Sequence, residues 1–190
     1  MFGPWVERLE AIAASNALIA TAGFRDAAGI ARSRAHVIPL SVLDGKGTGW
    51  SLDCGAAVRA LCFVGEDLLL SGGDDGRLIA WDVTGQKPPK GIGSPDSSLA
   101  QRGGLHFPAP VRAIAVDANV AKALAGMIAI GTADGMLHVL PFQIANGAPQ
   151  FGAPVGRRIS EGAVYAACFD PAGLVLAGTA EGQLWIAPAN

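Results

Sequence analysis

The stretch Gly72–Gly76 (GGDDG) has two carboxylates between glycines. Among the residues of this chain, these come closest in type and spacing to a ligand-binding motif. Such a stretch suggests a calcium loop or a cradle for a phosphate group. A calcium loop needs several more oxygen ligands at fixed spacings, and a phosphate cradle needs a helix that begins directly after it. Two short apolar runs, Leu68–Leu70 and Leu78–Trp81, flank this stretch. We therefore expect the tight turn of a β-hairpin and no metal or phosphate site.

The cysteines are the second candidate for chemistry. Their number, three, is odd, and Cys62 and Cys168 each stand directly before a Phe. Neither a CxxC pair nor a pair of His residues accompanies them, so we expect no metal site and no cofactor. We interpret Cys62 and Cys168 as buried thiols and expect the protein in the reducing cytoplasm.

Evenly spaced valines reveal an internal repeat. Val58, Val111 and Val164 follow one another at intervals of 53 residues, and each begins a short apolar run. Each run is followed by a turn that contains an acid and a glycine, at 74–76, 133–135 and 180–182. The agreement of strand and turn positions across three units predicts a repeat protein.

The second unit identifies the kind of repeat. Its stretch Leu68–Asp82, two apolar runs joined by a polar turn and closed by Trp81-Asp82, resembles the central hairpin of a WD40 propeller blade. The resemblance implies an all-β propeller of four-stranded blades, about four of them, with the last one incomplete. The corresponding blade limits are approximately 1–52, 53–107, 108–159 and 160–190.

In WD40 blades that fit the family pattern, a His, an Asp, a Ser or Thr and a Trp form a hydrogen-bonded brace. The resemblance assigns five residues of this chain to such structural positions: Ser71, Asp75, Trp81, Asp134 and Glu181. Where the family has Gly-His, this chain has Asp53-Cys54, so we expect an incomplete brace. We expect structural and not catalytic roles for these residues.

Three further residues share one repeat position, directly after the first valine of each inner strand: Arg59, Arg112 and Tyr165. In a propeller the inner strands surround the axis, so these side chains should gather at the mouth of the channel. Two arginines there suit an acidic peptide or an anionic ligand. The alternative is that these residues only line the edge of the channel and are hydrated.

The first unit is the most divergent. We expect its inner strand at Trp5–Ala13, with Val6 and Leu9 in the places of Val58 and Leu61. Residues 23–36 are predicted as a long inserted loop. This loop would carry a second basic cluster for an acidic partner, namely Arg25, Arg32 and Arg34.

Composition restricts the partners. The chain has 190 residues, of which 51% are hydrophobic and 16% charged, and its net charge is −2. This balance gives no basic surface for nucleic acid, and no apolar run is long enough for membrane insertion. No catalytic motif occurs either.

We expect a non-catalytic scaffold for protein–protein interaction and complex assembly, a subunit of a complex. The alternative is a small-ligand-binding or enzymatic propeller with a polar site at the channel mouth.

The ends of the chain suggest a last expectation. Met1–Pro4 makes a poor strand, and the fourth unit has only three predicted strands. Four blades of this kind should form an open arc with uncovered apolar faces. We expect a half-propeller that is completed by a second copy in a dimeric ring, by another protein's blades or by sequence outside this chain.

Overall fold

The computed structural model describes residues 8–16, 18–27, 30–39, 49–83, 99–117, 125–146 and 148–189. For residues 8–10, 23–27, 30–34 and 39 it describes the backbone only. The described residues form strands, turns and loops. In this part of the chain no helix has the length and apolar character that a membrane crossing requires.

The strands form four antiparallel sheets in chain order, which we call blades 1 to 4. Blade 1 contains β1 (Arg8–Ala14), β2 (Leu18–Ala27), β3 (Ile30–Pro39) and β4 (Trp50–Ser51). Blade 2 contains β5 (Val58–Val64), β6 (Leu68–Gly73), β7 (Arg77–Asp82) and β8 (Gln101–His106). Blade 3 contains β9 (Val111–Val116), β10 (Ala125–Thr132), β11 (Met136–Ala145), β12 (Ala148–Phe151) and β13 (Val155–Arg158). Blade 4 contains β14 (Val164–Phe169), β15 (Leu174–Thr179) and β16 (Leu184–Pro188).

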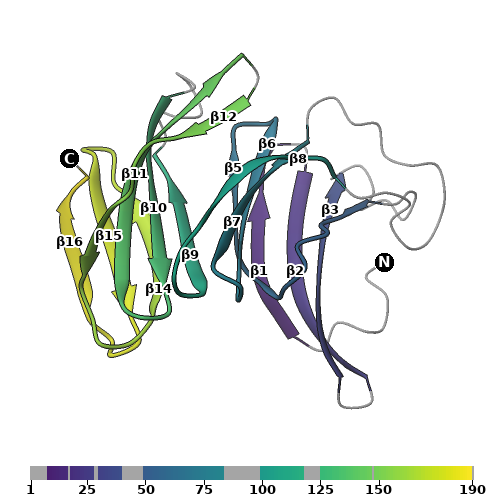
Figure 1. Ribbon diagram of the computed structural model, residues 1–190, viewed down its shortest axis with the longest axis horizontal. Coiled ribbons are helices and arrows are strands. Elements are labelled where there is room, and N and C mark those ends of the chain that lie inside the picture. Colours follow the sequence, from purple (N-terminus) through teal and green to yellow (C-terminus); the bar gives the residue numbers. More distant parts are fainter. Residues whose placement is uncertain are drawn as a thin grey trace.

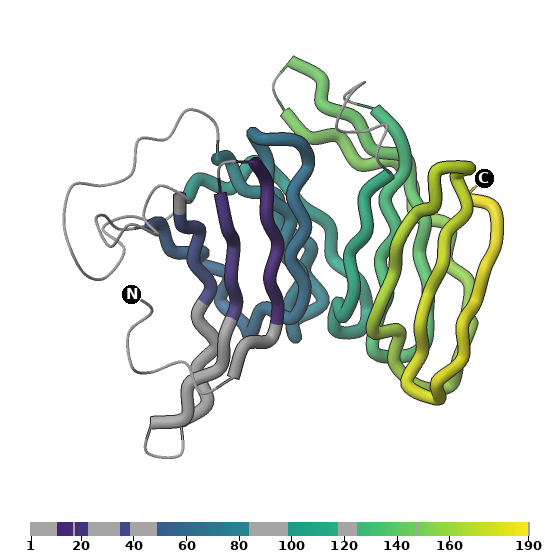
Figure 2. The backbone as a smooth tube through the Cα atoms, turned by 180° about the vertical axis from the view of Figure 1, so that it is seen from behind, coloured from purple at the N-terminus to yellow at the C-terminus, as the bar shows by residue number. Residues whose placement is uncertain are grey.

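The blades stand side by side in chain order, with blade 1 and blade 4 at opposite ends of the row (Figures 1 and 2). Their inner strands β1, β5, β9 and β14 pack against one another in sequence. The all-β architecture predicted from the repeat is therefore confirmed, including a last blade of three strands. The row is an open arc, because its first and last blades do not meet.

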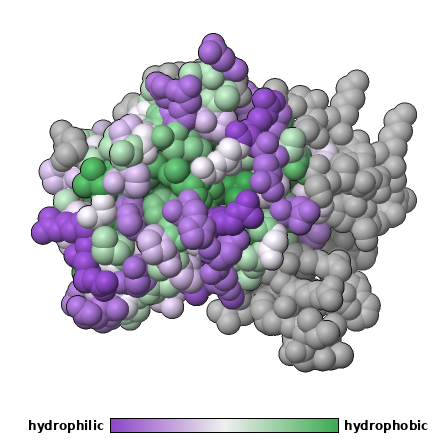
Figure 3. Space-filling model, viewed as in Figure 1, coloured by the Kyte–Doolittle hydropathy of each residue, from purple (hydrophilic) through white to green (hydrophobic). Residues whose placement is uncertain are grey.

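Each junction between consecutive blades is filled by an apolar cluster. Trp81 and Leu69 of blade 2 pack towards blade 1, while Leu70 and Leu78 pack towards blade 3. A third cluster joins blades 3 and 4 around Val164. Figure 3 shows hydrophobic residues gathered over the junction of blades 2 and 3 in the middle of the drawn face. A face of a sheet is thus buried only where a neighbouring blade covers that face.

A β-bulge in every inner strand fixes the register of the repeat. The ladder skips one residue after Val58, after Val111 and after Val164. In β1 the equivalent skip follows Leu9, which pairs with Gly23. Leu9 therefore holds the position of Val58, and the prediction that Val6 holds it is wrong. The apolar spacing alone did not reveal which residue precedes the bulge.

The predicted inserted loop at 23–36 is also wrong. Residues 23–27 continue β2 and residues 30–36 belong to β3, and the two strands pair antiparallel, with Arg25 opposite Arg32 and Arg34 opposite Gly23. Continued pairing satisfies backbone N–H and C=O groups that a loop would leave to water. The three arginines thus lie on strands, and their side chains fall outside the described part.

Blade 3 has one strand more than the sequence predicts. After β11 the chain forms two further strands, of which β12 pairs with the far end of β11 and β13 pairs with its near end. The additional strand lengthens the outer rim of the arc.

Candidate functional site

The tight turns of blades 2 to 4 lie at the same end as the first residues of the inner strands, and we call this end the turn face. Gly76, Gly135 and Gly182 have φ values of 77°, 81° and 75°, which glycine adopts without strain. A Cβ on Gly76 would lie 2.3 Å from the carbonyl oxygen of Phe107. The turn of blade 2 is therefore held against the segment that enters blade 3.

Asp74, in the turn of blade 2, binds two arginines of the turn face. The Arg59 guanidinium donates to both carboxylate oxygens, with Nη2 to Oδ2 at 2.6 Å and Nε to Oδ1 at 3.0 Å. Arg112 of blade 3 donates from Nη1 to Oδ1 at 2.8 Å. This triad of Arg59, Asp74 and Arg112 bridges blades 2 and 3. Its side chains remain 23%, 33% and 24% exposed, so solvent reaches all three.

The hydrogen bond from Arg59, together with the charge of Arg112, holds the pKa of Asp74 below its usual 3.8, although burial opposes the shift. The ionised carboxylate therefore stabilises the folded chain above the unfolded-state pKa, and that stabilisation is lost as the pH falls through the lowered value. We expect the stability difference between the wild type and Asp74→Asn to be constant near neutral pH, to shrink as the pH falls below the unfolded-state pKa, and to disappear below the lowered folded-state pKa. Denaturant unfolding at a series of pH values measures this difference, and a difference that persists at low pH contradicts the account.

Tyr165 occupies the same repeat position as Arg59 and Arg112, but it lies on blade 4 and is 62% exposed. The turn of its own blade begins with Ala180, which offers no carboxylate. The structure thus brings Arg59 and Arg112 onto one carboxylate and leaves Tyr165 as an exposed ring on the same face. Sequence reasoning missed Asp74. Its signal was an acid at a turn position where the other units have Ala133 and Ala180.

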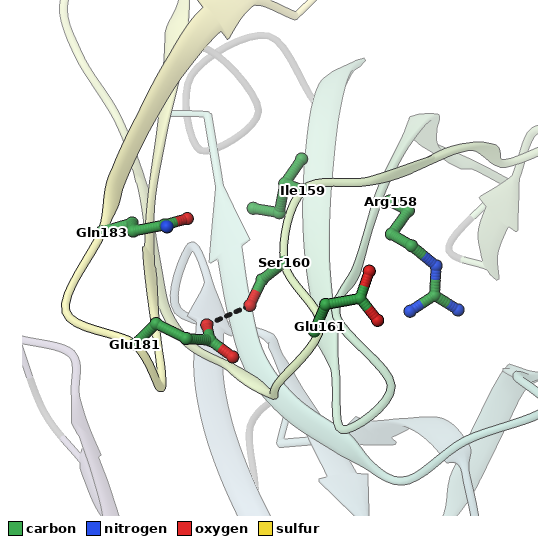
Figure 4. A pocket seen from close by; sticks show the side chains of 6 residues that line it. All are labelled: Arg158, Ile159, Ser160, Glu161, Glu181 and Gln183. Carbon is green, nitrogen blue, oxygen red and sulfur yellow. Dashed lines mark hydrogen bonds between the residues drawn. The ribbon is translucent and has the colours of Figure 1, made fainter.

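A shallow, open pocket of about 400 Å³ lies on the turn face between blades 3 and 4. It is lined by Arg158, Ile159, Ser160, Glu161, Glu181 and Gln183. The Ser160 hydroxyl donates to Glu181 inside it (Figure 4). This hydrogen bond lowers the pKa of Glu181. The hydroxyl is thereby fixed as a structural donor, and no His or Cys lines the pocket to activate it as a nucleophile.

The residues assigned to the brace make local structural contacts. The Trp81 indole Nε1 donates to Ser71 Oγ at 2.7 Å, and both side chains are buried. Cys54, in place of the family's His, brings its sulfur to 3.8 Å from the same Oγ. Asp75 accepts instead from the backbone N–H of Arg77, at 3.1 Å. Asp75 thus caps the turn in which it lies.

The turn acids of the other two blades each accept a hydroxyl hydrogen bond. Thr132 Oγ1 donates to Asp134 at 2.6 Å. Burial would raise the pKa of Asp134, but the hydrogen bonds from Thr132 and the backbone outweigh it and lower the pKa. Glu181 is bound by Ser160 in the same manner. These contacts fix the turns and carry no chemistry of their own.

The cysteines differ from the prediction at one position. Cys54 is buried, Cys62 is half-buried and Cys168 is exposed. Burial raises the pKa of Cys54 and of Cys62 to about 11. The prediction of a buried Cys168 is wrong because it lies on the face of blade 4 that no further blade covers. Among the described residues, no group of three or more His, Cys, Asp or Glu side chains is placed to hold a metal ion.

Comparison with known proteins informs the fold and not the site. No protein-family model matches the sequence, and no curated protein matches it. Among solved structures 375 chains match, so the fold is widespread and does not by itself define a function. One is the crystal structure of Chaetomium thermophilum Sqt1 bound to the N-terminus of the ribosomal protein L10, with 18% identity and a TM-score of 0.68.

This likeness covers 96% of the chain described here and 45% of the Sqt1 chain, so the present chain spans less than half of that length. The neighbour is a WD40 propeller protein. Its match to nearly the whole chain agrees with the order of the sheets and with the tight turns at one face. The chain therefore has the fold of a WD40-type β-propeller, with four blades of which the last has three strands.

Proposed function

We propose that the chain is a non-catalytic scaffold that binds protein partners through its turn face. The observation that carries this proposal is the exposed Tyr165 on the same face as the triad of Arg59, Asp74 and Arg112. Tyrosine and arginine are enriched among the residues that dominate binding energy at protein interfaces. Because the inner strands hold these residues rigidly, little conformational freedom is lost on binding.

The partner segment that fits this face is acidic. The triad has two guanidinium groups and one carboxylate, so it keeps a net positive charge. A peptide carboxylate can share the exposed edges of the two guanidinium groups beside Asp74 while an apolar side chain packs on the Tyr165 ring. The basic residues Arg25, Arg32 and Arg34 on the β2–β3 hairpin form a second proposed contact for an acidic partner.

Several observations support this proposal over a small-ligand or enzymatic site at the channel mouth. The arginines there already bind an internal carboxylate, Asp74, so a small anion would have to compete with it. The neighbour Sqt1 was crystallised with a segment of another protein. For the present chain we propose the same class of partner, a protein segment, in a cytoplasmic complex. We propose neither nucleic acid nor a cofactor as a ligand.

The proposal includes a second kind of contact, at the ends of the arc. Blade 4 has an uncovered face with exposed Leu184 and Ile186. Exposed apolar surface of this kind is typical of an interaction site. We propose that further blades pack there and complete the ring.

The binding proposal predicts that Tyr165→Ala reduces capture of the partner about tenfold, equivalent to about 1.4 kcal/mol. The immobilised chain is incubated with lysate of its native cell and with an array of acidic peptides, and bound material is quantified by mass spectrometry and fluorescence. Asp74→Asn, which leaves two guanidinium groups without their carboxylate, is expected to strengthen binding to acidic peptides.

The matched control is Val155→Ala, since Val155 is 74% exposed but lies on the outer strand of blade 3. It should bind like the wild type. If Tyr165→Ala and Asp74→Asn both bind like the wild type as well, the turn face is not the binding site and the proposal is wrong.

A further inference from the structure

Blade 4 presents an apolar face on the side away from blade 3, and we call this its forward face. Cys168, Leu176 and Ile186 form one row across the three strands, and Ala166, Gly178 and Leu184 form the next. Leu184 is 66% exposed and Ile186 is 53% exposed. Six side chains and one glycine thus form a flat apolar surface across β14, β15 and β16: Ala166, Cys168, Leu174, Leu176, Leu184, Ile186 and Gly178.

The same positions are covered in the other blades. Leu78 pairs with Gly72 in blade 2, Leu137 pairs with Gly131 in blade 3, and Leu184 pairs with Gly178 in blade 4. The first two leucines are 0% and 2% exposed, against 66% for Leu184. Residue type and register are identical, but a next blade covers Leu78 and Leu137, whereas no blade covers Leu184.

The glycines Gly72, Gly131 and Gly178 hold the same repeat position, and the first two show which residue of a covering blade packs there. A Cβ on Gly72 would lie 2.3 Å from Val111 Cγ1 of blade 3, and a Cβ on Gly131 would lie 2.7 Å from Val164 Cγ1 of blade 4. At both of these junctions the first apolar residue of the next inner strand therefore rests directly on a glycine. Gly178 is the third of these glycines, and a Cβ there would meet only Ala166 Cβ of its own blade, at 3.6 Å.

Blade 1 carries the complementary surface. In the register of its bulge Leu9 holds the position of Val58, and Ala11 follows as Ala60 does. Ile12, which holds the position of Leu61, is 61% exposed, whereas Leu61 is 8% exposed beneath blade 1. One chain thus has both halves of a blade–blade junction uncovered, one at each end of the arc.

We infer that the forward face of blade 4 binds blade 1 of a second copy of this chain, and that the reciprocal contact closes a two-fold ring of eight blades. This inference rests on the proposal that further blades complete the arc, and it names their source. In register, the β1 position that Leu9 holds in the second copy stands opposite Gly178, as the position of Val111 stands opposite Gly72. A rotation of 180° forms both junctions at once, which is the usual symmetry of a homodimer. Eight blades lie within the known range of propellers.

Sedimentation velocity of the full chain at micromolar concentration tests this inference. The wild type is expected to sediment with twice the 19.3 kDa of one chain. Leu184→Asp places a charge in the apolar junction and should give single chains. Gly178→Val should do the same, because its side chain would fill the space over Gly178 that the next inner strand occupies over Gly72. Val155→Asp changes an exposed apolar residue outside the junction, and this variant should remain a dimer.

Circular dichroism melting separates loss of docking from loss of folding, because Leu184 and Gly178 have few contacts in the single chain. A wild type that sediments as one chain, a double species unaffected by Leu184→Asp, or open oligomers larger than two chains would each overturn the inference. Partner capture through Tyr165 is measured independently. If the wild type is a monomer but Tyr165→Ala still reduces partner capture, only the ring is refuted. If the wild type is a dimer but Tyr165→Ala and Asp74→Asn leave partner capture unchanged, only the turn-face proposal is refuted.

Discussion

Trp81→Ala is expected to lower the free energy of unfolding by about 3–5 kcal/mol, as a large aromatic is removed from a packed site. Trp81 is 0% exposed and lies in the cluster that joins blades 1 and 2. The substitution also removes the indole donor that satisfies the buried Ser71 hydroxyl at 2.7 Å. Urea unfolding followed by circular dichroism measures the loss.

Two control variants test how much of this loss comes from the hydrogen bond and how much from the burial of the ring. Ser71→Ala leaves the buried indole N–H without its partner and is expected to cost about 1–3 kcal/mol. Trp185→Ala should cost less than Trp81→Ala, because Trp185 is only partly buried and Arg157 covers its ring at 5.6 Å. An unfolding midpoint of Trp81→Ala equal to that of the wild type would show that the register of blade 2 is wrong.

Gly131→Val is expected to destabilise the chain by about 1–3 kcal/mol or more, the usual cost of overpacking. Its side chain would be forced between blades 3 and 4, where even a Cβ would lie 2.7 Å from Val164 Cγ1 and 2.9 Å from the Val164 carbonyl oxygen. The backbone contact cannot be relieved by a change of rotamer. Thermal and urea unfolding measure the effect in the Leu184→Asp background, which is expected to be monomeric.

Gly178→Val is the matched control, with the same substitution at the same repeat position. No blade covers Gly178 in the single chain, so the change in stability should stay within about 0.5 kcal/mol. Equal losses for Gly131→Val and Gly178→Val would show that the penalty comes from the sheet itself. In that case the idea that each glycine receives an apolar residue of the next blade would be wrong.

The sequence predicts the blades well because their signals are local and repeated. The apolar runs that begin at Val58, Val111 and Val164 and the turn glycines Gly76, Gly135 and Gly182 each depend only on residues close in sequence. All of them recur at the same place in blades 2 to 4. Blade 1 was harder, since Leu9 precedes a bulge that the apolar pattern does not reveal.

Contacts between blades were less predictable, because they join residues far apart in sequence. The partner of Arg112 is Asp74 of the preceding blade, and nothing in either local pattern pairs them. Cys62 and Cys168 hold the same repeat position and each stand directly before a Phe, so their local pattern does not reveal that only Cys62 is covered by a further blade. The long β2–β3 hairpin was missed because glycines and arginines in residues 23–36 suggest a loop when considered alone.

Thiol reactivity tests most directly the central claim that each blade face is buried by the next blade along the chain. Cys62 and Cys168 have the same repeat position, but blade 3 packs over the face of blade 2 that contains Cys62. The native Leu184→Asp chain, which is expected to be monomeric, is treated with a maleimide, and the labelled cysteines are identified by mass spectrometry over time. The account predicts rapid labelling of Cys168, with Cys62 and Cys54 labelled only on unfolding. Labelling of Cys62 as fast as Cys168 would contradict it.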